Sequence, residues 1–80
     1  MEMMDGLGTY MRHRRAKLGF TQEAVARRMD VSTRQLMKWE AGEAKPSIEN
    51  LAKWLDALGV AYTDIQHILL GQSPGTLLYN

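Results

Sequence analysis

The spacing of apolar and polar residues along the 80-residue chain predicts five short helices. In the first, Leu7, Met11 and Leu18 recur at helical spacing, and Gly19 lies where a helix would end. Asp5 is placed to cap its start. In chain order, the helices are expected at about 7–18, 22–29, 33–40, 48–58 and 62–70. The chain is therefore expected to form an all-α domain.

Only a tight turn separates the second and third predicted helices. Thr21 and Ser32 are placed as their N-caps, and Gln35 completes a capping box with Ser32. Asp30 occupies the turn, where it must tolerate a left-handed backbone. Two short helices joined in this way are typical of a helix-turn-helix unit, which we expect over about 22–40.

The third predicted helix has an apolar side and a polar side. Leu36 and Trp39, three residues apart, are expected to point into the core. The opposite side then carries Thr33, Arg34, Met37 and Lys38. The major groove of DNA admits one helix, and side chains near its N-terminus contact base edges. We therefore expect Arg34 to contact guanine O6 and N7, with Thr33 beside it and Lys38 one turn further along.

The fourth predicted helix has more apolar residues than one face needs. Its inward stripe is expected to be Ile48, Leu51, Leu55 and Leu58, with Pro46 and Ser47 before it and Gly59 after it. Trp54 flanks that stripe. A flanking position favours the edge of the core, where large aromatic residues often mark interfaces, and the sequence leaves a core position open as well.

Basic residues are concentrated in the first half of the chain. Between residues 12 and 38, eight Lys and Arg residues stand against two acids, a local balance of +6, although the whole chain carries only +1. From residue 51 onward the balance is −1. A basic front and a more apolar back suit a protein that faces phosphate on one side and a partner on the other.

Three motifs in fixed order resemble a known family. They are T-Q-x-x-V-A-x-x-x-D-V-S from residue 21, W-E-x-G from residue 39, and K-P-S-x-x-x-L-x-x-x-L-x-x-L-G-V from residue 45. Together they resemble the helix-turn-helix family of phage Cro and repressor proteins, also called the xenobiotic-response-element family. The similarity covers about residues 7–60 and implies a five-helix, lambda-repressor-like domain that binds double-stranded DNA.

The same resemblance implies roles for residues away from the exposed side of the third helix. By resemblance, Gln22 would contact a phosphate from the start of the second helix. Backbone amides of the loop at 41–45 can bind phosphate in the same way, with Lys45 adding a charge. Arg15 and Glu40 would form an ion pair that holds the third helix to the first. The predicted DNA-binding residues are Gln22, Ser32, Thr33, Arg34, Gln35, Lys38 and Lys45, although capping also explains Ser32 and Gln35.

The composition argues against several other functions. The chain has no cysteine, which excludes disulfides and thiolate metal sites and suits the reducing cytoplasm. His13 and His67 lack partners at metal-ligand spacing, and no phosphate-binding loop or nucleophile motif is present. We expect no enzyme activity, metal or cofactor. No apolar run reaches the roughly 18 residues of a membrane span, and no signal peptide is recognisable. These observations predict a cytoplasmic protein that has no contact with membranes.

Apolar residues continue beyond what the first four helices need. They include Tyr62, Ile65, Ile68, Leu69, Leu70, Leu77, Leu78 and Tyr79. We divide the chain into a DNA-binding domain, residues 1–70, and a tail, residues 71–80, and expect a two-fold dimer through the fifth helix and the tail. Such a dimer would act as a repressor on an inverted-repeat operator.

Other functions fit the same pattern. An antitoxin would bind a toxin protein and use the same helix-turn-helix for autoregulation. A restriction-modification controller or a phage Cro-like protein fits the length equally well. An interaction module that had lost DNA recognition is the least favoured alternative, because Arg34 and Lys38 remain on the exposed side of the third helix.

Overall fold

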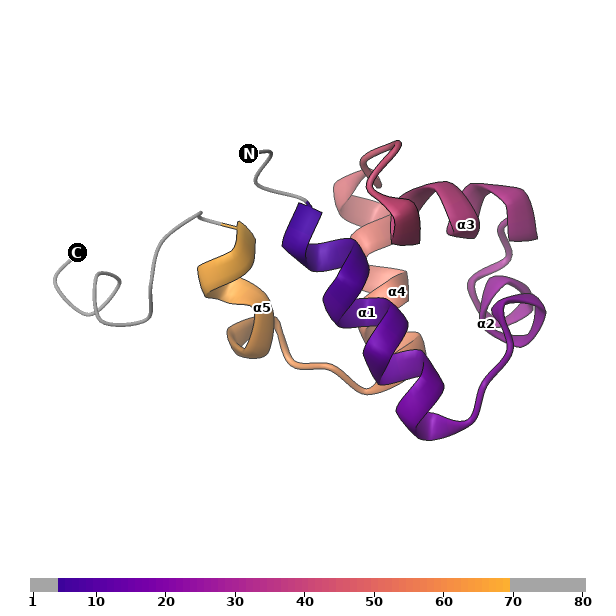
Figure 1. Ribbon diagram of the computed structural model, residues 1–80, viewed down its shortest axis with the longest axis horizontal. Helices are drawn as coiled ribbons and strands as arrows, with labels where there is room; N and C mark the ends of the chain where they lie inside the picture. The colour runs from indigo at the N-terminus through magenta and orange to yellow at the C-terminus, as the bar shows by residue number, and fades with distance from the viewer. Residues whose placement is uncertain (1–4, 70–80) are drawn as a thin grey trace, which may run out of the picture.

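The computed structural model describes residues 5–69 and contains five helices and no strand within them. In chain order they are α1 (Asp5–Leu18), α2 (Gln22–Met29), α3 (Thr33–Ala41), α4 (Ile48–Leu58) and α5 (Tyr62–Leu69) (Figure 1). The expected all-α, five-helix fold is confirmed. Asp5, expected as a cap, is the first residue of α1. The tail at 71–80 lies outside the described residues.

Side-chain caps start three of the helices where the sequence predicts them. The hydroxyl groups of Thr21, Ser32 and Ser47 each accept a hydrogen bond from a backbone N–H three residues later, at 3.0–3.1 Å. Each cap residue is extended, so the chain turns abruptly into the helix. These caps fix the starts of α2, α3 and α4.

The turn between α2 and α3 depends on a left-handed residue. Asp30 has φ 57° and ψ 45° and is the only residue other than glycine with positive φ among those described. Its neighbour Val31 donates its N–H to the Ala26 carbonyl at 3.0 Å, which closes the end of α2. The prediction that Asp30 adopts this conformation is confirmed.

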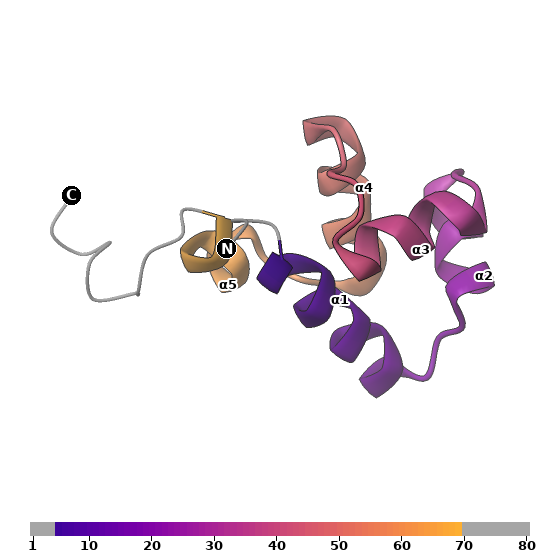
Figure 2. The same cartoon turned by 45° about the horizontal axis from the view of Figure 1, so that its top comes forward.

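One apolar core lies between the helices, and every helix contributes to it. α1 packs against α3, α4 and α5, and α2 packs against α3 and α4. Figures 1 and 2 show α5 at the opposite end of the molecule from α2. The buried apolar residues are Leu7, Met11, Val25, Ala26, Met29, Leu36, Trp39, Trp54, Leu58, Val60 and Ile65. The expected core positions of Leu36 and Trp39 are confirmed.

The orientation of α4 differs from the expectation. Trp54 is fully buried, and its ring lies 5.8 Å from that of Trp39, so an edge position for Trp54 is wrong. Ile48 is 86% exposed, and Leu51 and Leu55 are only half-buried. The large indole of Trp54 fills the space beside Trp39, and this rotates much of the expected stripe toward solvent. Leu18, expected to repeat with Leu7 and Met11, is likewise 42% exposed.

A glycine allows α1 and α3 to cross closely. A Cβ atom on Gly8 would lie 2.5 Å from the Glu40 carbonyl oxygen and 2.6 Å from that of Trp39. Both atoms belong to the backbone of α3, so a side chain at this position would push the helices apart. Gly8 therefore fixes how α3 is seated on α1.

Candidate nucleic-acid interface

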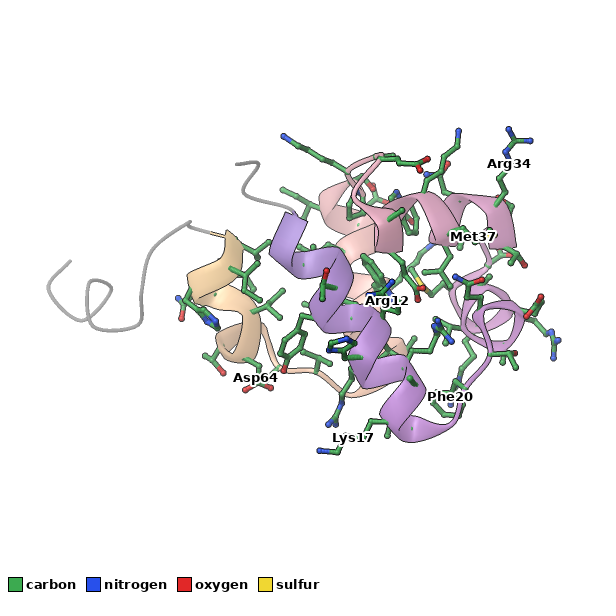
Figure 3. All side chains as sticks on the ribbon, viewed as in Figure 1. Arg12, Lys17, Phe20, Arg34, Met37 and Asp64 are labelled. Carbon is green, nitrogen blue, oxygen red and sulfur yellow. The ribbon has the colours of Figure 1, made fainter. Side chains whose placement is uncertain are left out.

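The outer face of α3 is polar, cationic and open to solvent. Arg34, Met37 and Lys38 are exposed, and Thr33 is half-buried at the start of the helix. Figure 3 shows Arg34 extending away from the body of the protein. This placement follows from Leu36 and Trp39, which hold the other side of α3 in the core. The side chains expected to contact base edges therefore lie on one accessible surface.

A shallow hollow of about 270 Å³ lies along this face. It is lined by Arg34, Met37, Lys38, Ala41 and Glu43. Glu43, just after α3, was missed in the sequence analysis. Its acidic charge gave no signal there, because an isolated glutamate in a loop is usually only solvated. Its position means that the surface holds one carboxylate beside two cations.

A side-chain cap commits Ser32 to the backbone. Its hydroxyl accepts the Gln35 N–H at 3.0 Å, which is one of the two bonds of the expected capping box. Ser32 is exposed and Gln35 is half-buried, both at the start of α3. Ser32 therefore has a structural role, and a DNA contact by Ser32 or Gln35 stays a prediction.

An ion pair joins α1 to the end of α3. Arg15 Nε donates to Glu40 Oε2 at 2.7 Å, and Arg15 Nη2 donates to Glu40 Oε1 at 3.1 Å. Arg15 Nη1 also donates to the Phe20 carbonyl at 2.9 Å. The Glu40 side chain is only 3% exposed. The predicted pair is confirmed, and its bidentate geometry restricts how α3 can rotate on α1.

The structure gives Gln22 a partner that the sequence did not predict. Its side-chain Nε2 donates to Glu40 Oε1 at 2.9 Å. Gln22 is half-buried at the first position of α2, so its expected contact with phosphate would start from a side chain already held inside the domain. No sequence signal reveals this bond, because the two residues are 18 positions apart.

Several cations of the basic front have structural partners. The Arg28 guanidinium lies 5.3 Å from the centre of the ring of Phe20, which is labelled in Figure 3 between α1 and α2. Arg14 Nε donates to the Leu58 carbonyl at 3.4 Å, at the end of α4. The local charge of +6 therefore includes structural cations as well as candidates for DNA contacts. Lys45 lies outside that stretch and is exposed in the loop between α3 and α4.

Residues 5–69 contain neither a metal-binding cluster nor a membrane-spanning helix. No three His, Asp or Glu side chains gather there in a way that would hold a metal ion. No helix in this part of the chain is long and apolar enough to cross a bilayer.

Known structures share this arrangement of helices. Two crystal structures of the clp gene regulator ClgR from Corynebacterium glutamicum match with TM-scores of 0.80 and 0.79. The first is 31% identical and covers 89% of this chain and 76% of that chain. The second is 30% identical and covers 90% of this chain and 92% of that chain. A family model described as helix-turn-helix matches residues 11–65. No protein of curated function matches by sequence.

Proposed function

Because the chain belongs to the helix-turn-helix family of DNA-binding transcriptional regulators, we propose that it is a repressor that recognises a specific operator in double-stranded DNA. A repressor of this kind acts by occupying a site that polymerase needs. This function requires the cytoplasmic location that the sequence predicts.

The observation that carries the proposal is the exposed face of α3. Arg34 reaches into solvent from the first turn of the helix, and Lys38 lies one turn further along the same side. An arginine in that position can donate two hydrogen bonds to guanine O6 and N7. We assign base contacts to Arg34, Thr33 and Lys38.

Contacts to phosphate would hold α3 in register along the groove. We assign these to Gln22 at the start of α2 and to Lys45 in the loop after α3. Ser32 and Gln35 lie at the start of α3 and would contribute to phosphate binding at the N-terminus of that helix. None of the phosphate contacts selects a base, so specificity would come mainly from Arg34.

We further propose that two copies bind an inverted repeat. An apolar groove of about 350 Å³ lies between α4 and α5. Its lining residues are Ile48, Leu51, Ala52, Leu55, Tyr62 and Leu69. α5, which forms one wall, lies at the opposite end of the molecule from Arg34 (Figure 3). A second copy seated on this groove would leave both α3 helices free to enter successive major grooves, about 10 base pairs apart.

The dimer surface that we propose differs from the one expected from the sequence. It keeps Tyr62 and Leu69 of α5, but α4 would supply most of the apolar side chains because it is rotated toward solvent. The contribution of the tail stays a prediction. In the antitoxin alternative, a toxin protein would occupy the same groove, and the purified protein would then sediment as a monomer at tens of micromolar.

Selection from a pool of random duplexes tests the proposed function. The purified full-length chain should enrich an inverted repeat with a guanine in each half-site, and Arg34→Ala should lose the preference at that position. Exposed Arg12 provides a matched control, since Arg12→Ala removes the same charge from α1 instead of α3 and should leave the base preference unchanged. Failure to enrich any sequence would contradict the proposal.

A further inference from the structure

The carboxylate of Glu40 connects three helices at one point. Its Oε2 accepts from Arg15 Nε on α1, and its Oε1 accepts both from Arg15 Nη2 and from Gln22 Nε2 on α2. Arg15 alone supplies two charge-assisted bonds and neutralises the buried charge. The bond to Gln22 is therefore additional to the ion pair, and it restrains the side chain of Gln22.

This bond fixes the orientation of the Gln22 amide. An amide group has two N–H donors on nitrogen and two lone pairs on oxygen. If it turned over, the carbonyl oxygen of Gln22 would face the Glu40 carboxylate, and two acceptors would repel each other. The carboxylate therefore keeps Nε2 directed toward Glu40 and leaves its second N–H for another acceptor.

The surroundings of Gln22 suit an anionic acceptor. Gln22 is the first residue of α2, where the backbone N–H groups of the first turn have no acceptor within the helix. The Thr21 hydroxyl takes one of these, the Ala24 N–H, at 3.0 Å. Glu23 is an exposed acid in the same turn, whereas the charge of Glu40 is neutralised by its ion pair with Arg15. Phosphate would therefore approach from the side away from Glu23.

From this geometry we propose that Glu40 is a positioning residue for DNA binding, because it holds the Gln22 amide ready to donate to a backbone phosphate. The inference rests on the proposed function and deepens it. Glu40 belongs to α3, so the phosphate contact of α2 is set relative to the helix that contacts the bases. A shift of α3 in the groove would then also cost the phosphate bond.

A double-mutant cycle, read out as DNA affinity of the full-length protein, tests the proposal. The variants are Gln22→Met, Glu40→Gln and the two combined, with Gln66→Met on α5 as a matched control for Gln22→Met. Gln22→Met should weaken binding to selected and random duplexes alike, by about 3- to 10-fold for one hydrogen bond. The salt dependence should stay unchanged, because a neutral side chain releases no counterion.

The cycle separates positioning from folding. Glu40→Gln also breaks the ion pair with Arg15, so it should weaken binding in both backgrounds. If Glu40 acts through Gln22, the loss should be larger in the wild-type background than in the Gln22→Met background. Binding is measured below the melting transition of the least stable variant, checked by circular dichroism. Equal losses in both backgrounds would overturn the proposal and leave Glu40 with a structural role alone.

An independent measurement needs no substitution at Glu40. In the wild-type protein, NMR signals of the Gln22 side-chain amide should show two well-separated protons, one held by the carboxylate, and the other should shift when duplex is added. Signals that ignore the duplex would also overturn the inference. If Gln22→Met binds normally while Arg34→Ala loses specificity, this inference and the phosphate contact of Gln22 fail, and the proposed recognition of an operator stands. If the wild type binds no duplex, the proposed function fails first.

Discussion

Replacing Gly8 by alanine sets helix propensity against packing. Propensity alone predicts a gain of about 1 kcal/mol in the free energy of unfolding, because glycine is a poor residue inside a helix. Packing predicts the reverse. The new Cβ atom would lie 2.5 Å from the Glu40 carbonyl oxygen, whereas ordinary contact begins at 3.4 Å. The obstacle is backbone, so α1 and α3 must separate and strain the Arg15–Glu40 pair.

The expected outcome follows from the two magnitudes. Overpacking costs about 1–3 kcal/mol, and a Cβ only 2.5 Å from a backbone oxygen belongs at the upper end of that range. The net loss should therefore be about 2 kcal/mol after the gain from propensity. For a domain of this size, that loss lowers the melting temperature by about 8–16 °C. Thermal melts followed by circular dichroism measure it directly. Affinity for the selected operator should fall as well, because α3 shifts on α1.

A matched glycine in the same helix provides the control. A Cβ on Gly6 would lie 3.2 Å from Ile68 Cγ2, the end of a side chain that can move. Gly6→Ala should therefore be neutral or stabilising by up to about 1 kcal/mol. If Gly8→Ala melts as high as Gly6→Ala, the close crossing of α1 and α3 does not constrain the fold, and our account of how α3 is seated is wrong.

Three further sets of substitutions test separate parts of the account. Lys45→Ala should weaken binding to specific and random DNA alike and reduce the slope of log affinity against log salt concentration by about 1 for each half-site contacted. An unchanged slope would mean that Lys45 does not contact phosphate. Arg15→Ala and Glu40→Ala should each lower the free energy of unfolding by about 3–5 kcal/mol, and the double variant should lose less than the sum. Strict additivity in denaturant melts would mean that the two residues act separately. Ile48→Glu should weaken the dimer in sedimentation experiments while leaving the melt of the monomer nearly unchanged, because Ile48 is 86% exposed. Leu18→Glu, at another exposed apolar residue, is its control, and equal effects of the two would argue against the groove as the interface.

The sequence predicted the local features of the fold because they depend on neighbouring residues. Thr21, Ser32 and Ser47 cap helices through bonds that span only three positions. Asp30 adopts the left-handed turn that its side chain tolerates. The Arg15–Glu40 pair is a long-range contact, and it was predicted only through the family resemblance.

The features that the sequence missed depend on how helices meet. α4 carries an apolar stripe and a tryptophan, so helical spacing alone cannot decide which side is buried. The ring of Trp39 decides it, by packing against Trp54. The close approach at Gly8 and the Gln22–Glu40 bond likewise arise from contacts between elements distant in sequence. The predicted DNA-binding residues lie on α2, on α3 with its cap, and in the loop that follows α3. Their contacts with DNA stay predictions.

The central claim is that Arg34 contacts a guanine in the major groove. The most direct test pairs wild-type protein and Arg34→Ala with the selected operator and with the same operator carrying 7-deazaguanine at the predicted base. Loss of N7 removes one acceptor of the bidentate contact. A bidentate contact contributes about 1–3 kcal/mol to discrimination between bases. We predict that the modified base weakens wild-type binding by a large part of that amount and leaves binding by Arg34→Ala unchanged. Equal weakening of both proteins, or of neither, would contradict the claim.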